Sequence, residues 1–120
     1  MKERIEILGK IIHGRGYGRT IGFPTLNLDR RQFSRLAKKP KLGVHSGKVF
    51  LSGREYRAGV VIGPLDRRGL PRVEAHLIGF KGNAYGKMAV IRLGRFIRPF
   101  KKFKTEKELI VQIQKDLRKC

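Results

Sequence analysis

The side chains best suited to chemistry lie in one stretch, GRGYGRTIGFPTLN, at residues 14–27. Pro24 fixes its own φ and keeps the residue before it out of the helical region, so the end of this stretch is predicted to be extended. In an extended segment, residues two apart point the same way, which places Thr25 and Asn27 on one face. A hydroxyl and an amide oxygen are hard ligands that suit Mg²⁺, which completes its shell with phosphates and water. The stretch therefore predicts a small magnesium site.

The first half of the stretch has glycine at three alternate positions, Gly14, Gly16 and Gly18, with Arg15 and Arg19 among them. Such a backbone can approach a ligand closely. No Gly-Lys-Ser/Thr follows, so this is not a Walker A motif, and the spacing is not G-x-G-x-x-G. On the residues alone a tight turn is favoured over a phosphate cradle, and both interpretations stay open.

A second group of candidates lies on a predicted strand at 72–80, where Glu74 and His76 share the face opposite Val73, Ala75 and Leu77. A glutamate can act as a general base. A strand glutamate is nevertheless more often part of a surface ion pair, and a strand histidine is more often structural. The remaining candidates, His13, His45 and Cys120, do not have metal-ligand spacing.

Net charge is the unusual property of this composition, because 29 Lys and Arg stand against nine Asp and Glu, for a net charge of +20. Such a balance favours polyanions or phosphorylated small molecules as partners, although it also serves solubility. The 120 residues predict one domain, 1–120. A single cysteine excludes an internal disulfide, and no signal peptide or run of about 18 apolar residues is present. We therefore expect a cytoplasmic monomer that does not enter membranes.

The elements that must position these residues are mostly strands. Turn residues separate short alternating segments, and Ser52-Gly53 is a hairpin signal. Thr105 and Glu108 form a capping box that begins a final helix, whose apolar face is predicted to carry Ile110, Ile113 and Leu117. The pattern predicts an all-β fold, a small closed Greek-key-like barrel of about six strands with the helix packed outside. The expected strands are 3–13 (bent or bulged at Gly9), 23–28, 43–51, 55–62, 72–80 and 87–97, with loops at 29–42 (one helical turn at 33–37) and 63–71.

Several motifs, in order, resemble those of the ATP-dependent riboflavin kinases, the domain that also forms the C-terminal half of bacterial FAD synthetases. The family pattern G-R-x-x-G-x-P-T-A-N is matched by Arg19, Gly22, Pro24, Thr25 and Asn27. VEAHLIGF, AYGK and IRPFKKF then follow as in the family, so the resemblance covers nearly the whole chain.

The resemblance implies transfer of the ATP γ-phosphate to the 5′-hydroxyl of riboflavin, giving FMN and ADP. It implies that Glu74 is the catalytic base and contacts the flavin, as Arg98 does, although Arg98 alone could equally be a solvated charge. It implies a Mg²⁺ site at Thr25 and Asn27. The implied nucleotide-binding residues are Gly14, Arg15, Gly16, Tyr17, Gly18, Arg19 and Thr25.

The chain departs from the family pattern at Leu26, at Val61, at Gly79 and in Pro64-Leu65-Asp66. The adenylyltransferase half is missing, so FAD formation is not expected.

Two other functions remain open: a non-enzymatic basic barrel that binds nucleic acid, or an inactive flavin- or nucleotide-binding relative. The first predicts that aromatic residues alternate with Lys and Arg on one strand face. The sequence has three Tyr, seven Phe and no Trp, mostly scattered.

Overall fold

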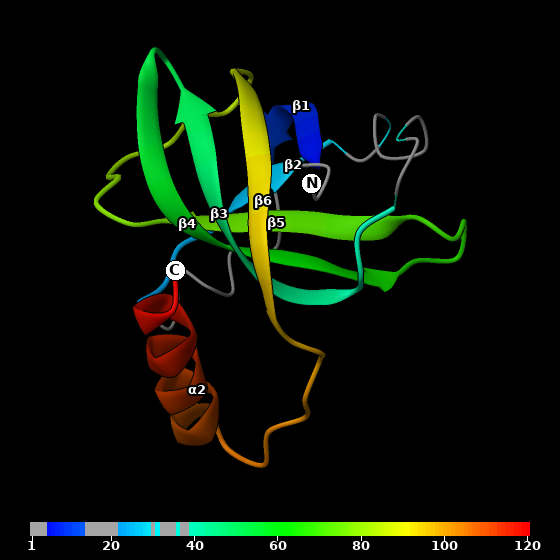
Figure 1. Cartoon of the computed structure of the whole chain (residues 1–120), viewed down its shortest axis with the longest axis vertical. Coiled ribbons are helices and arrows are strands. Elements are labelled where there is room, and N and C mark those ends of the chain that lie inside the picture. Colours follow the sequence, from blue (N-terminus) through cyan, green and yellow to red (C-terminus); the bar gives the residue numbers. More distant parts are fainter. Residues whose placement is uncertain (1–4, 14–21, 30, 32–35, 37–38) are drawn as a thin grey trace.

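The computed structural model describes residues 5–13, 22–29, 31, 36 and 39–120. Within them, antiparallel strands close into a barrel in the order β1-β2-β5-β4-β3-β6, with one helix beyond the barrel (Figure 1). The strands β3, β4 and β5 are consecutive neighbours, and β6 returns to lie beside β3, which is Greek-key order. The predicted barrel is thus confirmed. The elements are β1 (Glu6–Ile12), β2 (Leu26–Leu28), β3 (Gly43–Leu51), β4 (Arg54–Leu65), β5 (Pro71–Leu77), β6 (Met88–Arg98) and α2 (Glu106–Arg118).

Alternation along the strands fills the barrel. In β5 the residues Val73, Ala75 and Leu77 are buried, while Glu74 and His76 point outward, as predicted. The same alternation buries one face of β4 and one face of β6. Together these inward residues form one core, which includes Ile7, Ile11, Leu28, Val49, Leu51, Ala58, Val60, Ile62, Ala89, Ile91 and Leu93.

Gly9 corrects one prediction, because β1 has no bulge there. It pairs in regular register with Ala89 of β6. A Cβ atom on Gly9 would lie 3.0 Å from Leu28 Cδ2, so the glycine is needed for close packing against β2 rather than for a bend.

Several strand boundaries also differ from the prediction. The expected strand at 23–28 is a strand only over β2, and the expected strand at 72–80 ends at Leu77. Gly79 then has φ of 85°, a turn conformation that favours glycine. The hairpin at Ser52-Gly53 is confirmed, but β4 continues to Leu65, beyond its expected end at residue 62. The helical turn expected at 33–37 falls almost entirely outside the described residues.

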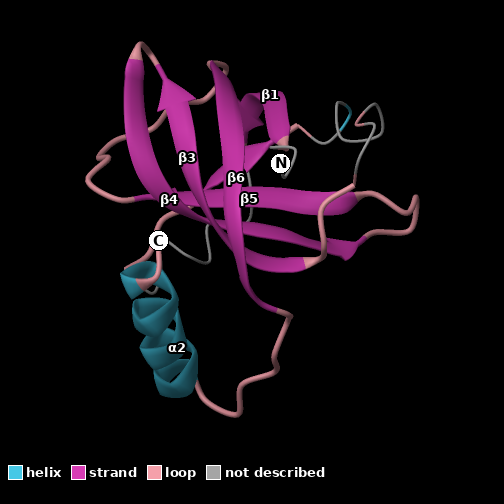
Figure 2. Cartoon of the chain, in the orientation of Figure 1, coloured by secondary structure: helices cyan, strands magenta, loops and turns pink. Residues whose placement is uncertain are grey.

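Helix α2 begins where the capping residues predict. Thr105 is the N-cap, and its side chain accepts a hydrogen bond from the backbone N–H of Glu108 at 3.1 Å. The Glu108 carboxylate accepts from the backbone N–H of Lys104, one residue before the N-cap. The helix stands outside the barrel (Figure 2), and its C-terminal end packs on β4, where a Cβ atom on Gly59 would lie 3.1 Å from Leu117 Cδ2.

Candidate active site

A cleft of about 440 Å³ lies between the outer surface of the barrel and α2. Its polar lining includes all the candidates from the second half of the glycine-proline stretch and from β5. Most of the remaining wall is apolar, so the cleft combines a few polar groups with a large apolar surface, as ligand sites do. The polar residues are Thr25, Asn27, Arg72, Glu74, His76, Arg98, Lys101 and Asp116, and the apolar ones include Phe23, Val44, Val61, Phe100, Phe103, Leu109, Ile113 and Leu117.

Strand pairing places the proposed metal ligands next to the proposed base. Asn27 on β2 lies directly opposite Glu74 on β5. The Cβ atoms of such a cross-strand pair are about 4.5–5.5 Å apart and point to the same side of the sheet. Thr25 lines the same cleft, whereas Leu26 packs against the barrel core, so the leucine points away from both polar neighbours.

Glu74 is half-buried in the cleft wall. Within the described part of the chain, its carboxylate has neither a hydrogen-bond partner nor an ion-pair partner. The surface ion pair that a strand glutamate usually forms is therefore not found among these residues. The carboxylate faces the cleft, where it can accept a proton from a ligand.

His76 has a structural contact that the sequence did not reveal. Its Nδ1 atom lies 2.7 Å from the carbonyl oxygen of Pro24. Because a carbonyl oxygen can only accept, Nδ1 carries the proton and donates it. The ring also meets Phe23 edge-to-face, with centroids 5.8 Å apart. His76 thus holds the segment that carries Thr25 and Asn27 against β5.

Arg98 is not a solvated charge. Its guanidinium forms a forked pair with the Asp116 carboxylate of α2, through Nε at 3.0 Å and Nη2 at 2.8 Å. Asp116 is only 4% exposed and also accepts a hydrogen bond from Gln112 at 2.9 Å. Arg98 further donates to the carbonyl of Pro99. The pair ties α2 to the end of β6 and forms part of the cleft wall.

Sequence reasoning missed Asp116. The predicted apolar helix face supplies Ile113 and Leu117 to the cleft, Leu109 lines the cleft as well, and Ile110 is half-buried. Asp116 carried one signal, since it is an acid in the strongly basic last turn of a helix. An acid there is disfavoured by the helix dipole, so a compensating partner could have been inferred.

A second depression, of about 470 Å³, adjoins the cleft at Thr25, which lines both. Near it, the ring of Tyr85 stacks on His13 with centroids 3.6 Å apart. The glycine-rich positions 14–19 fall outside the described residues, so their predicted role stays a prediction. The depression is lined by Pro24, Thr25, Leu26, Leu77, Phe80, Lys81, Gly82, Asn83 and Tyr85.

The described residues contain no group of three or more His, Cys, Asp or Glu side chains that could hold a metal ion. His45 is buried, and its Nε2 atom bonds to the Lys41 carbonyl at 2.8 Å, which is a structural contact. For a cation in the cleft, Thr25 and Asn27 offer neutral oxygen ligands, with the Glu74 carboxylate on the neighbouring strand. This donor set fits a Mg²⁺ ion that brings phosphate and water oxygens with it.

Comparison with known proteins shows the family of the chain. The family model for riboflavin kinase (flavokinase) matches residues 1–120. The chain belongs to the riboflavin kinase family. Among relatives of this family, the bifunctional riboflavin kinase/FMN adenylyltransferase of Haemophilus influenzae is 39% identical over 116 residues, which is 93% of this chain and 36% of the relative. The corresponding Listeria monocytogenes protein is 36% identical over 112 residues, covering 90% and 34%. The chain thus spans about a third of the length of the curated relatives it matches.

Two solved structures share this fold. A Streptococcus pneumoniae protein described as a macrolide-efflux protein superposes with a TM-score of 0.80 and 29% identity, over 94% of this chain and 37% of that one. Riboflavin kinase from Trypanosoma brucei superposes with a TM-score of 0.67 over 98% and 77%. At 24% identity, the second comparison supports the fold alone.

Helix α2, the helix that the structure describes, does not have the length and apolar character needed to cross a membrane.

Proposed function

We propose that this chain transfers the γ-phosphate of ATP to the 5′-hydroxyl of riboflavin, giving FMN and ADP. The observation that carries this proposal is the pairing of Asn27 with Glu74 inside a largely apolar cleft of about 440 Å³. That size suits a ligand as large as a flavin. The family membership supports the same reaction.

In the proposed reaction, Glu74 accepts the proton of the 5′-hydroxyl while that oxygen forms a bond to the γ-phosphorus. The bond between this phosphorus and the bridging oxygen breaks, and ADP leaves with those electrons. Phosphoryl transfer depends mainly on positioning and charge balance, so one well-placed base and a fixed substrate are sufficient protein chemistry. Mg²⁺, when bound, neutralises phosphate charge. The apolar wall of the cleft, including Phe100 and Phe103, would exclude water from the transferring group.

The nucleotide is proposed to lie toward the second depression, because Thr25 lines both that depression and the cleft. Residues 14–19 are proposed to hold the phosphates through backbone N–H groups. Arg98 is proposed to contact the flavin from the opposite wall, where its pair with Asp116 keeps the guanidinium in place.

Removing either proposed metal ligand should weaken nucleotide binding without unfolding the protein. We expect Thr25→Ala and Asn27→Ala each to reduce Mg-ATP affinity by about tenfold or more, by analogy with the losses seen when a metal site is perturbed. Titration calorimetry with Mg-ATP measures this. Thr105→Ala is the matched control: it removes an N-cap and should cost about 1 kcal/mol of stability, but it should not change Mg-ATP affinity. If the Thr25 or Asn27 variant binds Mg-ATP like the wild type, the substituted residue is not a metal ligand.

The direct test is incubation of the purified chain with riboflavin, ATP and Mg²⁺, followed by chromatography of the flavins. We expect FMN to accumulate, and we expect a chelator to prevent it. If riboflavin binds but no FMN forms with any nucleotide or metal, the chain is a binding relative without turnover.

A further inference from the structure

Three cations lie side by side on the outer surface of the barrel, away from the cleft. Lys48 on β3 is directly opposite Arg57 on β4 and directly opposite Arg92 on β6. Like charges in such positions are destabilising. Glu55 lies 3.1 Å from Lys48, and Glu6 lies 3.3 Å from Arg92. Arg57 has no carboxylate partner within the described residues, so the repulsion is only partly offset.

These cations line a depression of about 380 Å³ together with Lys119, which follows α2. No acidic side chain among the described residues lines it. Arg95 lies at its edge, where its guanidinium donates to the Lys119 carbonyl at 3.5 Å and its backbone N–H donates to Ser46 Oγ. Lys119 and Arg95 thus add positive charge to that of the three cations on the strands.

The depression also has an aromatic neighbour. Phe50 lies two residues after Lys48 on the same outward face of β3, and the Arg92 guanidinium sits over its ring at 5.0 Å. A nucleic-acid-binding barrel is expected to carry aromatic side chains between Lys and Arg side chains on one strand face. The sequence showed only scattered aromatics, whereas the strand register brings this one beside the cations.

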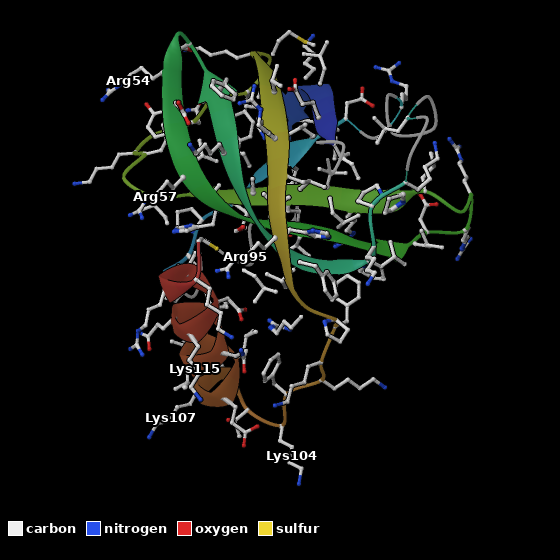
Figure 3. All side chains as sticks on the ribbon, in the orientation of Figure 1. Arg54, Arg57, Arg95, Lys104, Lys107 and Lys115 are labelled. Carbon is white, nitrogen blue, oxygen red and sulfur yellow. The ribbon has the colours of Figure 1, made fainter. Side chains whose placement is uncertain are left out.

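Positive charge continues from the depression along the molecule. In the view of Figure 3, Arg54 and Arg57 on β4 are followed downward by Arg95, then by Lys115 and Lys107 on α2, and finally by Lys104, which precedes the helix. Lys107 and Lys115 are about 2.2 helical turns apart, so their side chains are separated by about 80° around α2. We call this surface the basic strip; it consists of Lys48, Arg54, Arg57, Arg92, Arg95, Lys104, Lys107, Lys115 and Lys119.

We propose that the basic strip binds the phosphate backbone of a single-stranded nucleic acid, without sequence preference. A small phosphorylated ligand would occupy the depression alone and would leave Arg54 and the cations of α2 unused. An anionic membrane is flat, but the strongest cluster of cations lies in a hollow that a flexible strand can follow and a bilayer surface cannot. Arginine dominates the barrel part of the strip, and its planar fork suits phosphate.

None of the strip residues lines the cleft, so this site is separate from the proposed kinase site. The C-terminal part of α2 lies between them: Asp116 and Leu117 face the cleft, while Lys119 faces the depression. Substitutions in the strip should therefore leave FMN formation unchanged.

The test compares two variants of equal charge. Arg57→Gln with Arg95→Gln removes two strip cations, whereas Arg67→Gln with Arg68→Gln removes two exposed cations from the β4–β5 loop. Binding of a fluorescein-labelled oligouridylate of about 20 nucleotides, long enough to span one binding site, is followed by anisotropy between about 50 and 200 mM salt. We expect the strip variant to bind about tenfold more weakly at low salt, by loss of two phosphate contacts. Its slope of log affinity against log salt should fall in size by about 1.4, at about 0.7 for each phosphate.

The loop variant should match the wild type, and an oligonucleotide of mixed sequence should bind as well as oligouridylate. An equal loss in both variants would show that binding follows total charge, and it would overturn the strip as a site. Displacement of the oligonucleotide by Mg-ATP would move the site to the kinase cleft. The surface would instead be a membrane site if two results were found together. The wild type, but not the strip variant, would sediment with phosphatidylserine vesicles, and the wild type would not bind the oligonucleotide at about 150 mM salt.

Discussion

Replacement of Glu74 by glutamine is expected to reduce the kcat of FMN formation by about 10²–10⁴-fold, the usual contribution of a positioned general base. This corresponds to about 3–5 kcal/mol of transition-state stabilisation, at about 1.36 kcal/mol per tenfold. Glutamine keeps the length and hydrogen-bonding reach of the side chain but cannot accept the proton of the 5′-hydroxyl. Because Glu74 points into the cleft and not into the core, riboflavin affinity and the thermal midpoint should change little.

The outcome separates a base from a structural carboxylate. An exposed ion pair would contribute only about 0–1 kcal/mol, and it would contribute to folding rather than to turnover. The measurement is kcat, riboflavin affinity and thermal midpoint on the same preparation. Glu55→Gln is the matched control, since Glu55 is an exposed strand glutamate that pairs with Lys48 outside the cleft. A loss of less than about tenfold in kcat, or one that parallels unfolding, would remove Glu74 from the mechanism.

Replacement of Asp116 by alanine is expected to lower folding stability far more than the loss of an exposed ion pair would. Removing one partner of a buried ion pair costs about 3–5 kcal/mol, because the other charge stays buried without compensation. The Arg98 side chain is 19% exposed, so we expect a value near the lower end, about 3 kcal/mol. Alanine is also the better helix former, and it removes an acid from the last turn of a helix. Both effects would stabilise α2, so any net loss comes from the broken pair and from the lost hydrogen bond of Gln112 to Asp116.

Urea unfolding measures this change, with Glu55→Ala as the control for an exposed pair at about 0–1 kcal/mol. A double variant, Arg98→Met with Asp116→Leu, removes both charges and should recover most of the stability lost by Asp116→Ala. If Arg98 contacts the flavin, the double variant should remain weak in riboflavin binding although it folds well. A cost for Asp116→Ala no larger than that of the exposed pair would show that the pair does not hold α2 against the barrel.

Local patterns in the sequence were enough to predict the architecture. Alternation in segments such as 72–77 exposes Glu74 and buries its neighbours, because a pleated strand has a period of two residues. Thr105 and Glu108 predicted the start of α2, because an N-cap acts within one turn. The PTLN segment likewise predicted two oxygen ligands on one face, because proline restricts the backbone locally. The family resemblance predicted the same cleft residues by motif.

Contacts between distant segments were decided only by the tertiary structure. The register of β2 against β5 places Asn27 opposite Glu74, and this pairing joins segments that are far apart in the sequence. The partner of Arg98 lies 18 residues away on α2, so no local period indicates it. The packing of Leu28 against Gly9 and the line of Arg57, Lys48 and Arg92 depend in the same way on which strands become neighbours. Local sequence specifies the direction of each side chain, but the closed barrel determines what each side chain meets.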